Sequence, residues 1–117
     1  MTVYVDDMYR YEMGRFGRMK MSHLVADTRA ELLLMVTRIG VNAKWIQHPG
    51  EFGEHFDIAQ GKRTLAIENG AVAISLRQCS AMCMRRRVEG TLGTPEDAEP
   101  WRDRWALRNS QPNTRRE

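Results

Sequence analysis

Apolar residues recur at helical spacing in one clear segment of the chain. Leu32, Met35, Val36 and Ile39 share one face of a helix, because residues three and four apart lie one turn above each other. The preceding segment Thr28–Glu31 matches a capping box, in which Thr28 accepts from the amide of Glu31 and Glu31 reaches back. Gly40 follows as a C-cap. The pattern predicts a helix over residues 29–39.

Runs of β-branched and aromatic residues predict the first strands. Val3-Tyr4-Val5 indicates a strand over residues 2–6, and the segment 21–26 indicates a second. Residues 8–19 show no clean period and are typical of a long loop or an irregular hairpin. We expect the two strands to pair antiparallel at one end of a sheet.

The middle of the chain repeats the change from strand to helix. Residues 43–47 predict a third strand, and 48–60, with Pro49, Gly50 and Gly53, predict a loop. A short helix follows over 61–68 and stops at Asn69-Gly70. Residues 71–74 predict a buried fourth strand. Ser75–Gln78 resembles a second capping box, which opens a helix over 76–88.

Two strand–helix–strand units in succession imply right-handed crossovers and parallel neighbours. We therefore predict an α/β fold: a small mixed four-stranded sheet with three helices, ending near residue 90. Thr94-Pro95-Glu96-Asp97 then starts a short amphipathic C-terminal helix within 91–108. That helix either docks on the domain or awaits a partner. Residues 109–117 are polar and predict a mobile tail.

Composition and charge narrow the class of protein without naming a function. A chain of 117 residues with 42% hydrophobic and 28% charged residues is typical of one globular domain. No apolar run approaches the roughly 20 residues that span a bilayer, and the N-terminus lacks the pattern of a signal peptide. We therefore expect a cytoplasmic protein that does not bind a membrane. If a phage encodes it, the cytoplasm is that of the host cell.

The charge and the cysteines are compatible with several partners and require none. A net charge of +3 permits nucleic acid, nucleotide or acidic-protein partners. Cys79 and Cys83 share one helix face and are expected to be buried thiols rather than part of a disulfide framework.

The most suggestive polar segment is His55-Phe56-Asp57 followed by Lys62-Arg63. An exposed loop with an imidazole and a carboxylate leads to a helix start, where free amides attract anions and Gly61 allows close approach. The two cations oppose the helix dipole, a local conflict that a phosphate site would explain. We expect His55 and Asp57 to be separated by strand alternation unless the loop folds back. The alternative is that these residues only brace the loop and line a solvated face.

Other polar residues are weaker candidates for catalysis or metal binding. Asp6 and Asp7 end the first strand, and at most one of them is expected to face a given site. Antiparallel pairing brings His23 near Asp6 or Asp7, which forms a second polar focus for a metal ion, although a lone histidine is more often structural. His48, the third histidine, could join the loop of His55. Because no H-x-x-x-H or H-E-x-x-H spacing occurs, we predict no cofactor and leave a divalent metal as the weaker alternative.

Two further features favour a partner rather than a substrate. Arg85-Arg86-Arg87 ends the third predicted helix, where the dipole alone accounts for cations, but the three arginines would also bind nucleic acid or an acidic protein. Trp101 and Trp105 lie one turn apart in the C-terminal segment. These five residues form the candidate surface for a host protein or nucleoprotein complex.

Several segments together resemble one known family. They are Thr2–Met8, Arg18-Met19, Ser22–Thr28, Glu31-Leu32, Ile39-Gly40, Trp45-Ile46-Gln47, His55–Ile58, Lys62-Arg63 and Gly70-Ala71-Val72. The chain is similar over about residues 2–88 to the domain-of-unknown-function family 4031, small proteins of bacteria and their phages. The resemblance implies no established activity. It implies a serine before the Lys-Arg pair, where this chain has Gly61.

These observations lead to two functional hypotheses and a weaker third. The first is binding, with hydrolysis as an option, of a phosphate-bearing molecule such as a nucleotide at residues 55–63. His55, Asp57, His23 and Asp7 are then the candidates for catalysis, and Lys62, Arg63 and Gly61 bind the anion. The alternative is a phage-encoded interaction protein that inhibits a host defence complex. The third is metal-dependent phosphodiester cleavage by Asp6, Asp7, His23 or His55.

Overall fold

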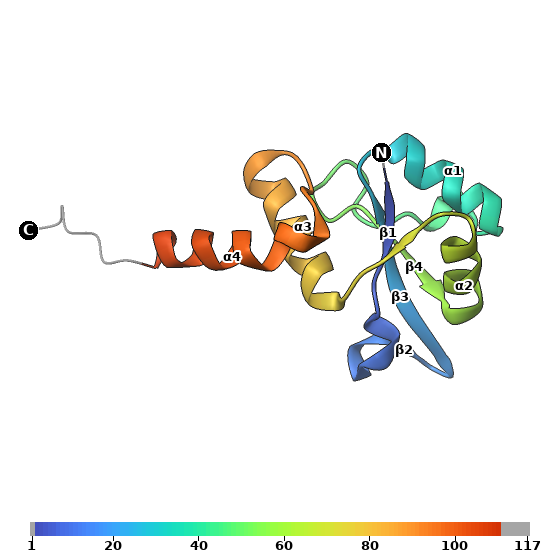
Figure 1. Ribbon diagram of the computed structural model, residues 1–117. Helices are drawn as coiled ribbons and strands as arrows, with labels where there is room; N and C mark the ends of the chain where they lie inside the picture. The colour runs from blue at the N-terminus through green and yellow to red at the C-terminus, as the bar shows by residue number, and fades with distance from the viewer. Residues whose placement is uncertain (1, 111–117) are drawn as a thin grey trace, which may run out of the picture.

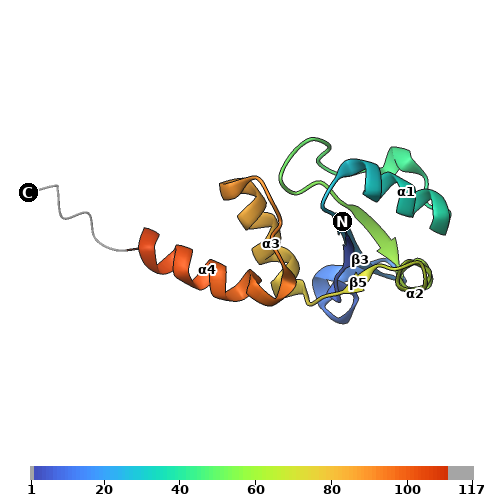
Figure 2. The same cartoon turned by 45° about the horizontal axis from the view of Figure 1, so that its top comes forward.

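The strands form the middle layer of three in the computed structural model, which describes residues 2–110 (Figure 1). Helices α1 (Arg29–Ile39) and α2 (Gln60–Glu68) cover one face of the sheet, and α3 (Leu76–Glu89) covers the other (Figure 2). Helix α4 (Pro95–Asn109) packs on α3 and points away from the sheet. The α/β class and the mixed sheet are confirmed.

Strand β3 (Met19–Ala26) is the centre of the sheet. It pairs antiparallel with β1 (Val3–Val5) along one edge and antiparallel with β4 (Phe56–Ala59) along the other. Strand β5 (Val72–Ala73) lies parallel to β1. The segment before β3 contains two 3-10 turns, η1 (Met8–Arg10) and η2 (Glu12–Gly14), and a two-residue strand β2 (Arg15–Phe16) that pairs with the start of β3. The antiparallel pairing of β1 with β3 is as predicted, but the pair lies inside the sheet rather than at one end, because β5 and β4 flank it.

The predicted third strand is wrong. Residues 43–45 form a 3-10 turn, η3 (Ala43–Trp45), because the Asn42 side chain accepts from the amide of Lys44 and bends the chain. The strand lies instead at 56–59, inside the predicted loop, where Phe56 and Ile58 are buried and alternate with half-buried neighbours. The described residues therefore form five strands and four α-helices.

The predicted crossover units are also wrong in direction. Strand β4 runs antiparallel to β3, so β3–α1–β4 is not a parallel βαβ unit. The parallel pair in the sheet joins β5 to β1 rather than to β4. The fourth predicted strand, expected to be buried, is the short exposed edge strand β5, with Val72 at 42% exposure. The buried residues of that segment are the flanking Ala71 and Ile74.

The helix boundaries follow the predicted caps. Thr28 accepts from the amide of Glu31 at the start of α1, and Gly40 ends α1 in the left-handed region at φ 78°. Ser75 and Gln78 form a complete capping box at the start of α3. These ends agree with the prediction because caps depend on local hydrogen bonds rather than on the rest of the fold.

Strand alternation divides the apolar residues between two cores. Val3, Val5, Leu24, Phe56 and Ile58 point toward α1 and α2, where they pack on the apolar face of α1. Tyr4 and Val25 point the other way, toward Cys79 and Met82 of α3 and Ala98 of α4. Side chains on neighbouring positions of β1, β3 and β4 therefore face different helices.

Helix α4 docks through its first half. Trp101 is 4% exposed and its indole Nε1 donates to Glu89 Oε2 at 2.7 Å. Arg85 of α3 forms ion pairs with Glu89 and with Asp97. The last turn contributes less, since Leu107 is 66% exposed. Residues 111–117 of the predicted tail lie outside the described residues.

None of the helices described between residues 2 and 110 combines the length and the apolar character that crossing a membrane demands.

We predict that Trp101→Ala lowers the free energy of unfolding by about 3 kcal/mol, because it removes a buried indole from the contact between α3 and α4. Urea unfolding followed by far-UV circular dichroism measures the change. Leu107→Ala on the exposed part of the same helix is the control, with a change within about 0.5 kcal/mol. Equal effects of the two substitutions would contradict the docking contact.

The Lys62 ammonium donates to the carbonyl of Ile39 at 2.8 Å, at the C-terminal end of α1. We predict that Lys62→Met, which keeps the apolar stem, lowers the free energy of unfolding by about 1 kcal/mol through loss of this bond. Lys20→Met at an exposed position of β3 is the matched control. The same urea titration compares them, and an unchanged midpoint for Lys62→Met would refute a stabilising role.

Candidate functional site

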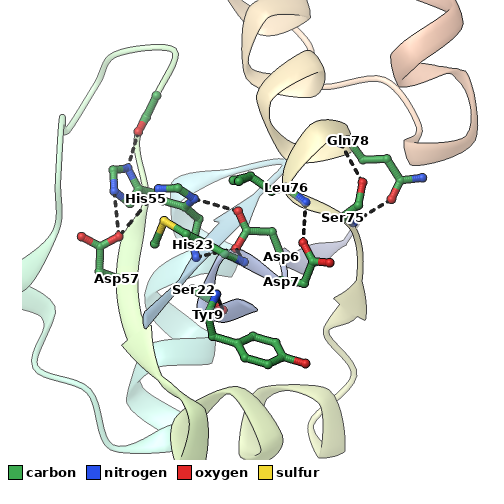
Figure 3. A network of polar contacts seen from close by, with 12 residues as sticks. Asp6, Asp7, Tyr9, Ser22, His23, His55, Asp57, Ser75, Leu76 and Gln78 are labelled. Carbon is green, nitrogen blue, oxygen red and sulfur yellow. Dashed lines mark hydrogen bonds and ion pairs between the residues drawn. The ribbon is translucent and has the colours of Figure 1, made fainter. Parts of the chain in front are cut away.

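Three polar side chains form a row across β1, β3 and β4. His23 is the direct neighbour of Asp57 in the register of β3 and β4. On its other side, the amide of Asp6 donates to the carbonyl of His23 at 3.0 Å, one step beyond the Val5–Leu24 pair. The row lies on the sheet face that α3 covers, and Figure 3 shows His23 between Asp6 and the pair His55–Asp57.

Asp6 is the innermost member of the row, with 0% exposure. Its Oδ1 accepts from the main-chain amides of His23 at 2.8 Å and Met8 at 3.1 Å. Its Oδ2 lies 2.7 Å from Nδ1 of the His23 ring. The expected proximity of His23 to one of the first two aspartates is therefore found for Asp6, and the contact fixes the orientation of the imidazole.

His55 enters the site from the residue before β4. A bridge between Gln47 and His55 ties the loop to the strand, and the buried carboxylate of Glu54 accepts from the amide of Gly50 and from Arg29. Nδ1 of His55 lies 2.7 Å from the carbonyl of Gly53. The ring meets that of His23 edge to face, with centroids 4.8 Å apart.

His55 and Asp57 share a face, contrary to our expectation of separation. Alternation separates neighbouring positions, whereas positions two apart point the same way. The loop therefore does not have to fold back to bring them together. Nε2 of His55 lies 3.2 Å from Oδ1 of Asp57, and Nε2 of His23 lies 3.9 Å from the same oxygen.

Asp57 Oδ1 is unusual because it is a buried carboxylate oxygen without a hydrogen-bond partner among the described residues. This oxygen is buried and accepts no well-directed hydrogen bond from any described residue, although two imidazole nitrogens face it. Interaction with His55 outweighs burial and lowers the pKa of Asp57, and His23 adds to the effect. Burial lowers the pKa of His55, but Asp57 and the Gly53 carbonyl outweigh it and leave that pKa raised. The arrangement thus favours positive charge beside Asp57.

The hydrogen bonds at Nδ1 determine what the two rings can offer. A carboxylate and a carbonyl only accept, so both rings hold their proton on Nδ1 toward Asp6 and Gly53. In a neutral ring the lone pair is then on Nε2, which faces Asp57. Histidine ligands of metal ions have this arrangement, with the second nitrogen held by a carboxylate or a carbonyl.

The spacing of the three atoms suits a metal ion. A metal about 2.0–2.2 Å from each ligand atom keeps neighbouring ligand atoms roughly 3.0–3.6 Å apart. The two nitrogen–oxygen distances here are 3.2 and 3.9 Å, and the three ligand atoms lie within 4.8 Å of one another. Small side-chain movements would close the set around one ion.

Helix α3 brings two thiols to the same place. Cys79 is buried and forms a second compact group with Asp6 and His23. Cys83, one turn later, is half-buried, and a hydrogen bond with Cys79, followed by nearby Arg86 and the two histidines, lowers its pKa to about 7 against the effect of burial. Both thiols and both histidines line a cavity of about 310 Å³.

The predicted anion-binding residues lie apart from His55 and Asp57. Five steps along the chain separate His55 from Gln60, the first residue of α2, which is about 16 Å at roughly 3.3 Å per residue. Asp57 lies within β4 and points to the face that α3 covers, whereas α2 covers the other face. Lys62 contacts the end of α1, and Arg63 donates to the carbonyl of Asp6 at 2.9 Å and lies over the ring of Tyr9. Gly61 faces open space. Anion binding by Gly61, Lys62 and Arg63 stays a prediction, because these residues do not come together with His55 and Asp57 in one site.

The remaining candidates contact other parts of the fold. Asp7 accepts from the amide of Leu76 at 2.7 Å and so holds the first turn of α3 (Figure 3). Arg86 donates to the carbonyls of Ala26, Phe52 and Glu54. Arg85 pairs with acids of α3 and α4, and Arg87 lies over Phe52.

The tryptophans and His48 lie at the edges of these contacts. Trp101 is buried, and Trp105 stacks on it in a half-buried position. His48 stacks on His55 with centroids 6.0 Å apart but keeps a 60% exposed side chain. The convergence of His23, His55 and Asp57 was missed in the sequence because β4 was not predicted. The signal that could have revealed it is the alternation of His55, Phe56, Asp57 and Ile58.

Comparison with known proteins gives one match. Neither the curated proteins nor the solved structures contain a match to this chain. A family model described as a protein of unknown function, DUF4031, matches residues 3–86. The matched range contains every residue of the site described above, from Asp6 to Cys83. The chain belongs to the DUF4031 family.

Proposed function

We propose that the protein binds one divalent transition-metal ion through His23, His55 and Asp57 and uses it in hydrolysis. The observation that carries the proposal is the buried Asp57 Oδ1, which has no well-directed hydrogen bond but faces two Nε2 atoms. When both rings are neutral, two nitrogen lone pairs face the carboxylate oxygen, a repulsion that a proton or a metal ion between them removes. A metal ion satisfies all three at once.

The ligand set supports a catalytic rather than a structural ion. Structural zinc sites usually have four protein ligands, whereas catalytic sites have three and leave a position for water or substrate. The three side chains here are 24%, 16% and 35% exposed, so water reaches them. Two imidazoles and one carboxylate suit zinc and also other first-row divalent ions.

An ion in this set supplies the chemistry that the side chains lack. Held by His23, His55 and Asp57, it would be a Lewis acid that activates water for attack on a phosphorus or carbonyl centre. Asp6 and the Gly53 carbonyl are positioning groups, since each holds one histidine at Nδ1.

We predict that protein stripped by a chelator takes up one equivalent of Zn²⁺ or Co²⁺. Isothermal titration calorimetry measures the stoichiometry, and the visible absorption of bound Co²⁺ reports nitrogen and oxygen ligands. His55→Ala and Asp57→Asn each weaken binding at least 100-fold, because a ligand atom is lost. His48→Asn is the matched control, since His48 is outside the set and asparagine tolerates its positive φ of 50°. Absence of metal uptake by the unaltered protein would overturn the proposal.

Asp6→Asn tests the orientation of His23 without removing a ligand. The asparagine oxygen can still accept from the amides of Met8 and His23, but its NH₂ group replaces the acceptor at Nδ1. We predict Zn²⁺ binding 10- to 100-fold weaker, as is usual for such supporting groups. Asp7→Asn is the control on the neighbouring residue and should leave the affinity unchanged. If the two variants bind Zn²⁺ equally, Asp6 does not orient a ligand.

A further inference from the structure

A second cavity opens beside the proposed metal site. It has a volume of about 550 Å³, and Asp57 lines it together with residues of η1, of η2, of the β2–β3 hairpin and of the segment 41–47. Cavities of 300–1,000 Å³ are typical of small-molecule sites. Asp57 belongs both to the proposed ligand set (His23, His55 and Asp57) and to the lining of this cavity, so its carboxylate connects the two.

The walls of this cavity are apolar side chains that the fold leaves uncovered. Met13, Phe16, Met19 and Trp45 are 66%, 79%, 50% and 62% exposed. All four line the cavity. A group of large apolar side chains exposed together is unusual on a soluble surface and marks a binding site.

The chemistry of the walls selects a flat ring. Trp45 and Phe16 offer aromatic faces, on which planar bases stack with little dependence on their identity. The polarisable sulfur of Met13 and Met19 adds favourable contacts with the edge of an aromatic ring. An aliphatic chain would use none of these preferences.

The charges select an anionic group on the same molecule. Arg15 lines the cavity, and the only carboxylate among its lining residues is Asp57, which interacts with His55 and, by the proposal above, with the ion. Arginine and a divalent ion both favour phosphate oxygens. We infer that this cavity binds a nucleotide, with its base between Trp45 and Phe16 and its phosphate toward Arg15 and the ion. The position of the phosphate rests on the proposed function.

Titration calorimetry of the full chain loaded with Zn²⁺ tests the inference with AMP, adenosine and inorganic phosphate. AMP should bind more tightly than either of the other two, because only AMP fills both halves of the cavity. Trp45→Ala should weaken AMP binding roughly tenfold or more. Trp105→Ala, on α4, is the matched control and should leave it unchanged. Arg15→Gln should weaken AMP but not adenosine, whereas Arg38→Gln on α1 should affect neither.

The outcomes separate this inference from the proposed function. Uptake of Zn²⁺ without any binding of AMP overturns the nucleotide and leaves the metal site intact. If the protein takes up no Zn²⁺ but binds AMP, and Trp45→Ala weakens that binding, the metal site is overturned and binding of the base by Trp45 and Phe16 remains supported. Equal binding of AMP and adenosine overturns the phosphate contact. A dimer in sedimentation velocity that Trp45→Ala dissociates and AMP does not would show that a second copy covers the wall, and would also overturn the inference.

Discussion

The buried carboxylate of Asp6 is the constraint on which most of this structure depends. An ionised group without solvent contact is costly unless hydrogen bonds replace the water. Here the amides of Met8 and His23 and the ring of His23 do so. The main chain of Asp6 adds a bond to β3 through its amide and accepts from Arg63 of α2 through its carbonyl. One residue thereby joins β1, β3, η1 and α2, and the orientation of His23 cannot change independently of the fold.

The two adjacent aspartates have different tasks, because β1 ends at Val5 and Asp7 leaves the extended conformation at ψ 30°. Asp6 points to His23 on the sheet face, and Asp7 accepts from the amide of Leu76 at the start of α3. The helix that covers the site is thus fixed by the residue next to the one that orients it. Because α3 starts there, Cys79 and Cys83 come to lie one turn and two turns later against the histidines, in the cavity of about 310 Å³.

The parts of the fold that could be predicted from sequence are those with local causes. The caps at Thr28 and Ser75 and the first two long strands needed only near neighbours in the chain. The prediction is wrong for the segments 43–47 and 56–59. Trp45 and Ile46 have strand propensity, but Asn42 bends the chain there, and the glycines before Phe56 are typical of a loop although a strand follows. Without β4 the row of Asp6, His23 and Asp57 could not be predicted, since it depends on pairing between residues far apart in sequence.

Three of the cationic side chains have a structural use that the net charge does not reveal. Arg63, Arg86 and Lys62 donate to main-chain carbonyls at Asp6, at Ala26, Phe52 and Glu54, and at Ile39, where strands, loops and a helix end. A carbonyl at such an end lacks a partner in its own element, and a long cationic side chain can reach it while its head remains partly hydrated. These three cations therefore stabilise the junctions between elements. Arg15 differs from them: it is exposed and lines the cavity beside Asp57, so charge at that position acts on a bound molecule rather than on the fold.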